Sequence, residues 1–359
     1  MKKEKEGIVV TDQIDKNKQI SELINSIQRE YGPGSINLLS KDALNQPFAG
    51  FSTGLISLDK VLGGRCPYGR IMELFGGESV GKSSLALQIV AAVQKIGGTA
   101  AYIDIEHAFD PKYSVQLGVD IEKLLLSQPD NGEQAMNILV HLCSSGLISL
   151  VVIDSVAALV PRSEIEGEVG DQSMGVMARM MGQTLRKVTA IAHKTNTEML
   201  FINQIRQKIG ILYGSNETTP GGNSLKFSAS HRLKLSLTGQ IKDGDKIIGN
   251  TVKIKVVKNK LAAPFQETEL DMLAGKGFDV EKDIIDMGVK YGLIEKSGSW
   301  YSYKTERLGQ GIKQVSSFFK SNPLLAEELK VNIMKKLNGD AMPVVVEVPA
   351  LPNPDGVSF

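Results

Sequence analysis

One short stretch, FGGESVGKSS at residues 75–84, constrains the fold of this chain more than any other feature. It has the spacing Gly-x-x-x-x-Gly-Lys-Ser and lies between a strand pattern over residues 70–75 and a helix pattern over residues 82–94. In this order the elements form a phosphate-binding loop, because glycines let backbone N–H groups surround phosphate oxygens at a helix N-terminus. The residues expected to bind a nucleotide are Gly76, Gly77, Glu78, Ser79, Val80, Gly81, Lys82, Ser83 and Ser84.

Two side chains of this loop carry distinct chemistry. Lys82 is expected to reach the β- and γ-phosphates, and the Ser83 hydroxyl is expected to ligate Mg²⁺. A second oxygen ligand usually comes from an acidic residue at the end of a buried strand. Asp154 directly follows the apolar run LISLVVI, which favours it as this ligand. The alternative is that Asp154 caps the helical segment VAAL that follows.

A carboxylate is also needed to polarise a water molecule for hydrolysis. In the segment YIDIEH, Asp104 and Glu106 stand at alternate positions near a strand end, which puts both on one face. This signal is weak by itself, because carboxylates often end strands simply to meet solvent. His107 is interpreted as a hydrogen-bonding loop residue.

From residue 50 to residue 280, apolar runs alternate with helical patterns. The further strands are expected over residues 100–105, 147–153 and 198–202. This alternation predicts an α/β fold with a mostly parallel twisted sheet flanked by helices. Two polar segments, 162–175 and 207–224, follow strands, and long loops at that sheet edge are typical ligand-binding segments.

The two ends of the chain differ from this core. Residues 15–31 carry one apolar stripe at helical spacing, whereas the charged residues before them are expected to fray. The stripe covers either this chain's own core or a neighbouring subunit. The expected organisation is an N-terminal helix in 1–42, a nucleotide-binding core in 43–280, a small α+β domain in 281–341 and an extended tail in 342–359.

Charge and cysteine content bound the partners and the compartment. The net charge is only +1, so an anionic partner needs a local basic patch. One candidate is TVKIKVVKNK, whose spacing by itself favours a solvated edge strand. The two cysteines, the absence of an apolar leader and the absence of an apolar run of about 18 residues indicate a cytosolic protein. The four lysines of this patch are Lys253, Lys255, Lys258 and Lys260.

Together these segments resemble the bacterial RecA recombinase family, over about residues 17–337. The resemblance is carried by long strings in the same order: GGESVGKSS, YIDIEHAFDPKY, SQPDNGEQA, VVIDSVAALVPRSEIEGEVGD, MGVMARMM, FINQIRQKIG, ETTPGGNSLKF, VVKNKLAAPF and EKSGSWYSY. It implies a RecA-type P-loop NTPase core, with an N-terminal polymerisation helix that packs on the next subunit of an open filament. The small C-terminal domain resembles the part of the family that gathers duplex DNA.

The resemblance also implies roles for single residues. Glu106 would activate the water, Asp154 would be the Walker B acid, and Asp110 and Tyr113 would hold the adenine of ATP. Gln204 would sense the γ-phosphate. The last pair, Lys258 and Lys260, would reach into the ATP site of the neighbouring subunit, which replaces the edge-strand interpretation for these two lysines.

The two polar segments would be the DNA-binding loops. Arginines and backbone N–H groups hold phosphates without reading sequence, and an aliphatic side chain can enter a base step. The implied activity is an ATPase that depends on single-stranded DNA, uses ATP and Mg²⁺, and exchanges strands with homologous double-stranded DNA. A co-protease role toward a LexA-like repressor is implied as well. The residues expected to contact DNA are Met174, Gly175, Arg179, Arg186, Arg206, Ile209, Gly221, Gly222 and Asn223.

Several positions depart from the family pattern. Gly77, Val80 and Ser83 stand where the family usually has Pro, Ser and Thr, and Gly182 replaces a usual serine. Ser83 keeps the hydroxyl, whereas Gly77 is expected to loosen the loop. The tail lacks an acidic cluster, which puts tail-based autoinhibition in doubt. Two alternatives stay open: a ring-forming helicase or other motor on the same fold, and a nucleotide-switched DNA scaffold that leaves ATP intact.

Overall fold

The computed structural model describes residues 2–39, 48–168, 175–207 and 217–338. The chain divides into one unit over Met1–Phe48 and a second over Ala49–Phe359. In the first unit, α1 spans Lys2–Tyr31. The expected fraying before residue 15 is therefore wrong, and the lysines and glutamates there are good helix formers. Gly32, with φ of 93°, follows the helix, and the expected tail lies outside the described residues.

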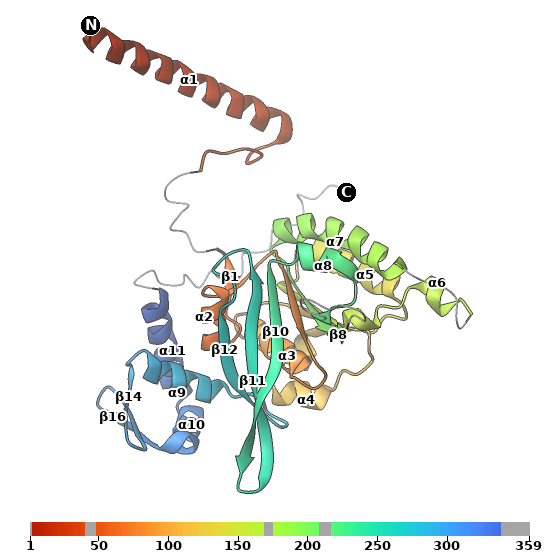
Figure 1. Ribbon diagram of the computed structural model, residues 1–359, viewed down its shortest axis with the longest axis vertical. Helices are drawn as coiled ribbons and strands as arrows, with labels where there is room; N and C mark the ends of the chain where they lie inside the picture. The colour runs from red at the N-terminus through yellow and green to blue at the C-terminus, as the bar shows by residue number, and fades with distance from the viewer. Residues whose placement is uncertain (1, 40–47, 169–174, 208–216, 339–359) are drawn as a thin grey trace. The chain divides into compact units, whose positions relative to one another are not determined.

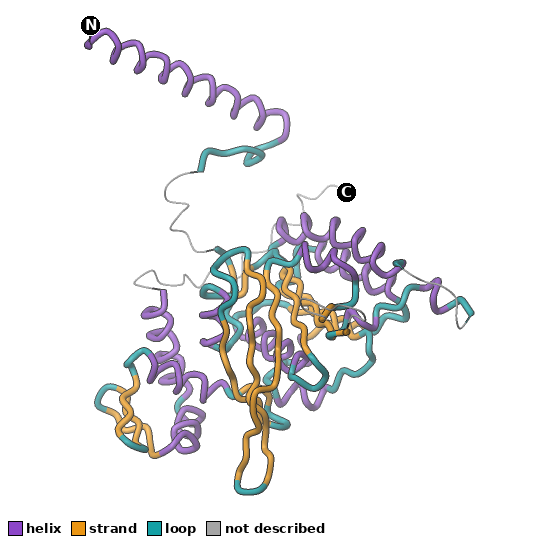
Figure 2. The backbone as a smooth tube through the Cα atoms, in the orientation of Figure 1, coloured by secondary structure: helices purple, strands orange, loops and turns teal. Residues whose placement is uncertain are grey.

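The second unit is built on one large sheet, and Figures 1 and 2 show helices on both of its sides. From β10 to β5 the neighbours are parallel, whereas β13, β12, β11 and β10 pair antiparallel. The expected strands are all present, with small shifts at their ends. In the described residues the strand order is β13 (Gly277–Phe278), β12 (Glu267–Leu273), β11 (Lys246–Asn259), β10 (His231–Asp243), β3 (Ile71–Gly76), β7 (Glu198–Gln204), β6 (Leu150–Asp154), β4 (Ala100–Asp104) and β5 (Leu124–Ser127).

Alternate strand residues pack on opposite faces of this sheet, as the two-residue period of a strand requires. Met72 and Leu74 belong to one apolar cluster, which α3 covers, while Ile71 belongs to a second cluster under α5 and α7. Both faces of the sheet are buried, which explains why the sequences of the parallel strands are continuous apolar runs. The helices are α3 (Lys82–Lys95), α4 (Pro111–Gln116), α5 (Gly132–Ser144), α7 (Val176–Thr195) and α8 (Gly222–Ser228).

Residues after β13 form a small domain with its own apolar cluster, which also takes in Ile56 of α2 (Ile56–Leu62). Asp283 accepts a hydrogen bond from the backbone N–H of Ser57 at 3.2 Å, so the domain is joined to α2 by polar as well as apolar contacts. Its elements are α9 (Val280–Lys290), β14 (Ile294–Ser297), β15 (Trp300–Tyr303), β16 (Glu306–Gln310), α10 (Gly311–Ser321) and α11 (Pro323–Asn338).

Short elements connect these parts. Cys66 and Cys143 are both buried and are not joined by a disulfide. None of the helices in the described ranges is long and apolar enough to span a membrane. The short elements are β1 (Gly50–Phe51), β2 (Cys66–Pro67), η2 (Ile121–Lys123), η3 (Val156–Ala158), α6 (Arg162–Ile165), β8 (Arg206–Gln207) and β9 (Glu217–Thr218).

A buried histidine in the sheet makes the stability of the fold depend on pH. His231 is 0% exposed and lies in β10 between β3 and β11. Burial lowers the pKa of its imidazole from 6.5 to about 4, so the folded chain keeps this ring neutral. The unfolded chain takes up the proton once the pH falls below its unfolded pKa. Stability from this group is therefore present above that pKa and is lost as the pH falls toward the folded value.

We expect His231→Val to remove this part of the pH dependence. Between about pH 7.5 and about pH 5, the wild type should lose about 2 kcal/mol of unfolding free energy more than the variant does. Urea unfolding of both proteins at the two pH values measures the difference. Equal losses in the two proteins would contradict a neutral, buried imidazole.

Candidate functional site

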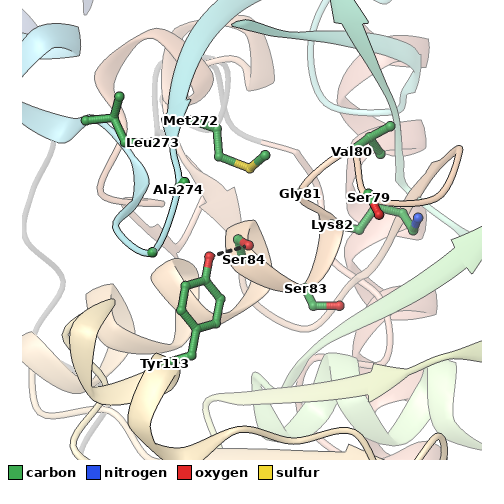
Figure 3. Close-up of a pocket in the computed structure, with 11 residues that line it drawn as sticks. Ser79, Val80, Gly81, Lys82, Ser83, Ser84, Tyr113, Met272, Leu273 and Ala274 are labelled. Atoms are coloured by element: carbon green, nitrogen blue, oxygen red, sulfur yellow. Dashed lines mark hydrogen bonds between the residues drawn. The ribbon is translucent and has the colours of Figure 1, made fainter. Parts of the chain in front are cut away.

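The glycine-rich loop between β3 and α3 forms one wall of a cavity of about 280 Å³. Figure 3 shows the hydroxyl of Tyr113 beside Ser84 at the start of α3, with Leu273 and Ala274 on the side opposite Ser79 and Val80 of the loop. The loop thus lines a space open to a ligand, at the carboxyl edge of a parallel strand. The lining residues are Ser79, Val80, Gly81, Lys82, Ser83, Ser84, Tyr113, Met272, Leu273, Ala274 and Gly275.

The backbone of the loop needs glycine where helix α3 begins. Gly81 is the N-cap residue, with φ of 88°, a conformation that side chains with a Cβ rarely adopt. A Cβ at this position would also lie 2.4 Å from Sδ of Met272. No side chain caps the helix, so the first N–H groups of α3 stay available to an anion.

Lys82 lies under the loop with most of its side chain buried. Its Nζ donates hydrogen bonds to the backbone carbonyls of Gly77 at 2.5 Å and Gly76 at 3.5 Å. Burial lowers the pKa of the ammonium group, while the nearby carboxylates of Asp154 and Glu106 act in the opposite direction. The ammonium is therefore held at the mouth of the loop, where phosphate oxygens would meet it.

Asp154 ends β6 and meets the loop across the sheet edge. Its Oδ2 accepts hydrogen bonds from the Ser83 hydroxyl at 2.8 Å and the Tyr102 hydroxyl at 2.6 Å. Burial raises the pKa of this carboxyl, and the two hydroxyl donors partly oppose that shift. The alternative that Asp154 caps the following helical turn is wrong, because the N-cap of η3 is Ser155 and makes no side-chain cap bond.

Glu106 lies beside this pair, just beyond the end of β4. Its Oε1 accepts a very short hydrogen bond from the Ser155 hydroxyl and a longer one, 3.4 Å, from Nε2 of Gln204. Two expected site residues, Glu106 and Gln204, are thus in contact, although one follows β4 and the other ends β7. Its side chain is exposed, so a water molecule can reach this carboxylate.

Asp104 differs from Glu106 in its burial and in its hydrogen-bond partners. It is 2% exposed and ends β4, so the strand alternation expected over residues 100–105 stops there. Its carboxylate accepts hydrogen bonds from the backbone N–H groups of Ala108 and Phe109 and from the side chain of Gln128. Asp104 therefore holds the loop that carries Glu106, and Glu106 is the carboxylate that faces the site.

Tyr113 and Asp110 stand at the start of α4. Asp110 is the N-cap residue and accepts hydrogen bonds from the backbone N–H groups of Lys112 and Tyr113. The Tyr113 hydroxyl lies 2.7 Å from Oγ of Ser84, which fixes the ring at the cavity wall (Figure 3). Asp110 does not line the cavity in this arrangement; it positions Tyr113.

Sequence reasoning missed the opposite wall of the cavity, residues 272–275, and the two hydroxyl residues Tyr102 and Ser155. The wall begins at the end of β12, which belongs to the antiparallel part of the sheet and carries no recognisable nucleotide-binding pattern. The one available signal was the Asp-Ser pair at the end of β6, which places a hydroxyl next to the carboxylate of Asp154.

The ammonium groups of Lys258 and Lys260 lie at the C-terminal end of α8. Lys258 Nζ donates to the backbone carbonyls of Lys226 at 2.6 Å and Phe227 at 3.0 Å, and Lys260 Nζ donates to Phe227 at 3.2 Å. Cations are favoured at this negative end of a helix. Two positive charges are thereby held close together, and Lys260 itself is exposed.

The other two lysines of the patch match the edge-strand interpretation in part. Lys253 and Lys255 alternate with buried Val252, Ile254 and Val256, as expected. Lys253 pairs with Glu267 of the neighbouring strand β12 at 2.7 Å. The strand is not at the sheet edge, however, because β12 and β13 lie beyond it.

Exposed cations surround the described ends of the two polar loops. Gly175 precedes α7, whose side chains Arg179 and Arg186 are exposed, and Arg206 is exposed in β8 after Gln204. The second loop ends in the turn that starts α8, with exposed Gly222 and Asn223. Met174 and Ile209 lie outside the described residues.

Comparison with known proteins gives consistent matches over nearly the whole chain. The RecA N-terminal domain family matches residues 18–279, and the RecA C-terminal domain family matches residues 282–338. Protein RecA of Legionella pneumophila is 50% identical over 324 residues, which cover 90% of this chain and 93% of the relative. Protein RecA of Caulobacter vibrioides is 50% identical over 329 residues, which cover 91% and 92%.

Proposed function

The chain belongs to the RecA family, and on this premise we propose that it is an ATPase stimulated by single-stranded DNA. It would form helical filaments on that DNA and exchange strands with a homologous duplex. The family places the chain among proteins of DNA recombination and repair that bind DNA and ATP. The observation that carries the finer proposal is the contact between Glu106 and Gln204, because Gln204 lies just ahead of the second polar loop, which begins at residue 207.

The residues around the loop fit a nucleotide with Mg²⁺. The free N–H groups of α3 and the ammonium of Lys82 suit the phosphates, and the ring of Tyr113 suits a base. Oγ of Ser83 lies 2.8 Å from Oδ2 of Asp154, and oxygen ligands of these two kinds are those that Mg²⁺ prefers. When bound, the ion would neutralise charge on the phosphates.

Glu106 would accept a proton from the attacking water. Ser155 donates to one oxygen of this carboxylate, which orients it and leaves the other oxygen for the water. Gln204 would report the state of the γ-phosphate, since its amide already contacts Glu106. The carboxylate of Glu106 and the amide of Gln204 lie at the same edge of the sheet. Proton transfer to Glu106 would therefore be linked, through Gln204, to the loop that follows β7.

The exposed arginines are proposed to hold the phosphates of DNA, while base pairing checks homology. Guanidinium groups bind phosphates without regard to sequence, which suits a protein that must accept any strand. Lys258 and Lys260 would contact the ATP site of the next subunit, and α1 would pack on that subunit. Such head-to-tail contacts build open filaments rather than closed rings. The co-protease role toward a LexA-like repressor stays a prediction.

Phosphate release from ATP and Mg²⁺, with and without single-stranded DNA, tests this function. We expect clear stimulation by DNA, together with open filaments in electron micrographs of the same samples. Hydrolysis that ignores DNA, or closed rings in place of filaments, would point to another motor on this fold. DNA binding with intact ATP would favour a nucleotide-switched scaffold.

A further inference from the structure

A buried polar network lies behind the glycine-rich loop, in three neighbouring strands of the sheet. Glu73 of β3 is 0% exposed and accepts hydrogen bonds from Nε of Arg232 in β10 and, at 2.9 Å, from Nδ2 of Asn203 in β7. The guanidinium of Arg232 also lies 4.6 Å from the ring centroid of Phe75. A buried carboxylate is strongly destabilising without such partners, so this network constrains all three side chains.

Asn203 uses its whole amide group in this network. Besides the bond to Glu73, Nδ2 donates to the carbonyl of Pro220 at 3.2 Å, and Oδ1 accepts the backbone N–H of Gln204 at 2.9 Å. The side chain is 0% exposed. One amide therefore joins the strand before the phosphate loop, the backbone of Gln204 and the segment that ends the second polar loop.

Pro220 is followed by a turn that tolerates little displacement. Gly221 is the N-cap of α8, with φ of 86°, and a Cβ there would lie 2.9 Å from Cγ1 of Val156. A Cβ on Gly222 would lie 3.0 Å from Cβ of Ala178 in α7. The turn is thus packed between the segment after Asp154 and the helix that follows the first polar loop, and the Pro220 carbonyl is its polar attachment to the sheet.

We propose that Asn203 and Glu73 are positioning residues that couple Gln204 to the turn at Pro220. Displacement of Gln204 would move its N–H, the amide of Asn203 would follow, and the turn with Gly221 and Gly222 would shift. Both carboxylate oxygens of Glu73 and both polar atoms of the Asn203 amide are hydrogen-bonded. A buried network of this kind has few alternative arrangements, so it transmits such a shift rather than absorbing it. This inference rests on the proposed DNA-stimulated ATPase.

Swapping the amide and the carboxylate between residues 203 and 73 distinguishes this coupling from an effect on folding. Asn203→Asp alone places two carboxylates together and removes both donors of the amide. Adding Glu73→Gln supplies a new donor toward residue 203 and keeps an oxygen for Arg232, so the link between β3 and β7 is restored with the same total charge. The Pro220 carbonyl still faces an oxygen and stays without its donor.

We expect the double variant to recover most of the unfolding temperature that Asn203→Asp alone loses, and to hydrolyse ATP without DNA at nearly the wild-type rate. Its stimulation by single-stranded DNA should fall about 10-fold, the usual size of a coupling between two sites. Asn203→Asp alone should lose both stability and activity. The ratio of stimulated to basal hydrolysis, measured beside thermal unfolding, distinguishes coupling from a structural role, because a purely structural pair would be fully rescued.

Undiminished stimulation in a folded double variant would overturn the inference and leave the proposed function intact. A wild type that DNA does not stimulate would instead reject the proposed function, and the inference with it. If the double variant does not fold, Asn203→Ala is the second variant, because it removes the Pro220 contact without adding charge. Loss of stimulation in that protein supports the coupling, and full stimulation contradicts it.

Discussion

Replacing Glu106 with glutamine should lower the rate of ATP hydrolysis by about 10²–10⁴-fold, while ATP-dependent binding to single-stranded DNA is kept. The amide has the shape of the carboxylate and can still accept the hydrogen bond from Ser155. It cannot take a proton from water. Phosphate release and filter binding on the same samples measure the two properties separately.

The matched control for this variant is Glu122→Gln, which removes an exposed carboxylate outside the cavity. It should hydrolyse ATP at the wild-type rate. If Glu106→Gln hydrolyses ATP as fast as this control, Glu106 is not the general base. Simultaneous loss of DNA binding would mean that the side chain acts through the nucleotide-bound conformation rather than through proton transfer.

Contiguous parts of the site were predictable from the sequence because neighbouring residues create them. The strand, the loop and the helix around Lys82 follow one another, and their phosphate-binding geometry depends mainly on local backbone conformation. Asp154 was predictable for a related reason, since a run of buried apolar residues ends at a carboxylate. The start of α1 was mispredicted because the helix begins at Lys2, ahead of the apolar stripe that marked it in the sequence.

Contacts between strands that lie far apart in the sequence were not predictable in the same way. The wall at Met272 lies at the end of an antiparallel strand, and the bond from Asn203 to Glu73 depends on β3 and β7 being neighbours in the sheet. Nothing in the residues around 73 or 203 specifies that strand order. Asp104 and Glu106 illustrate the same limit, because which carboxylate faces the site depends on where β4 ends.

The second large effect concerns Lys258 and Lys260, whose joint replacement by alanine should lower DNA-stimulated hydrolysis at least about 10³-fold. Cations that reach a phosphoryl group from a neighbouring subunit stabilise charge that develops during transfer. In the isolated chain the same lysines donate to carbonyls at the end of α8. Loss of activity in this variant alone would therefore not separate a role in the next subunit from support of α8.

Mixing two inactive proteins makes that separation. A subunit with both lysines replaced still carries Glu106, and a Glu106→Gln subunit still carries both lysines. If the lysines act across a head-to-tail interface, about a quarter of the sites in a random equal mixture are complete, and the mixture should recover activity on that scale. Lysines that act only within their own subunit, through α8, leave the mixture as inactive as its components. The control variant, with both Lys253 and Lys255 replaced by alanine, removes the same number of charges from β11, the strand that also carries Lys258. It should hydrolyse ATP without being mixed with a second protein.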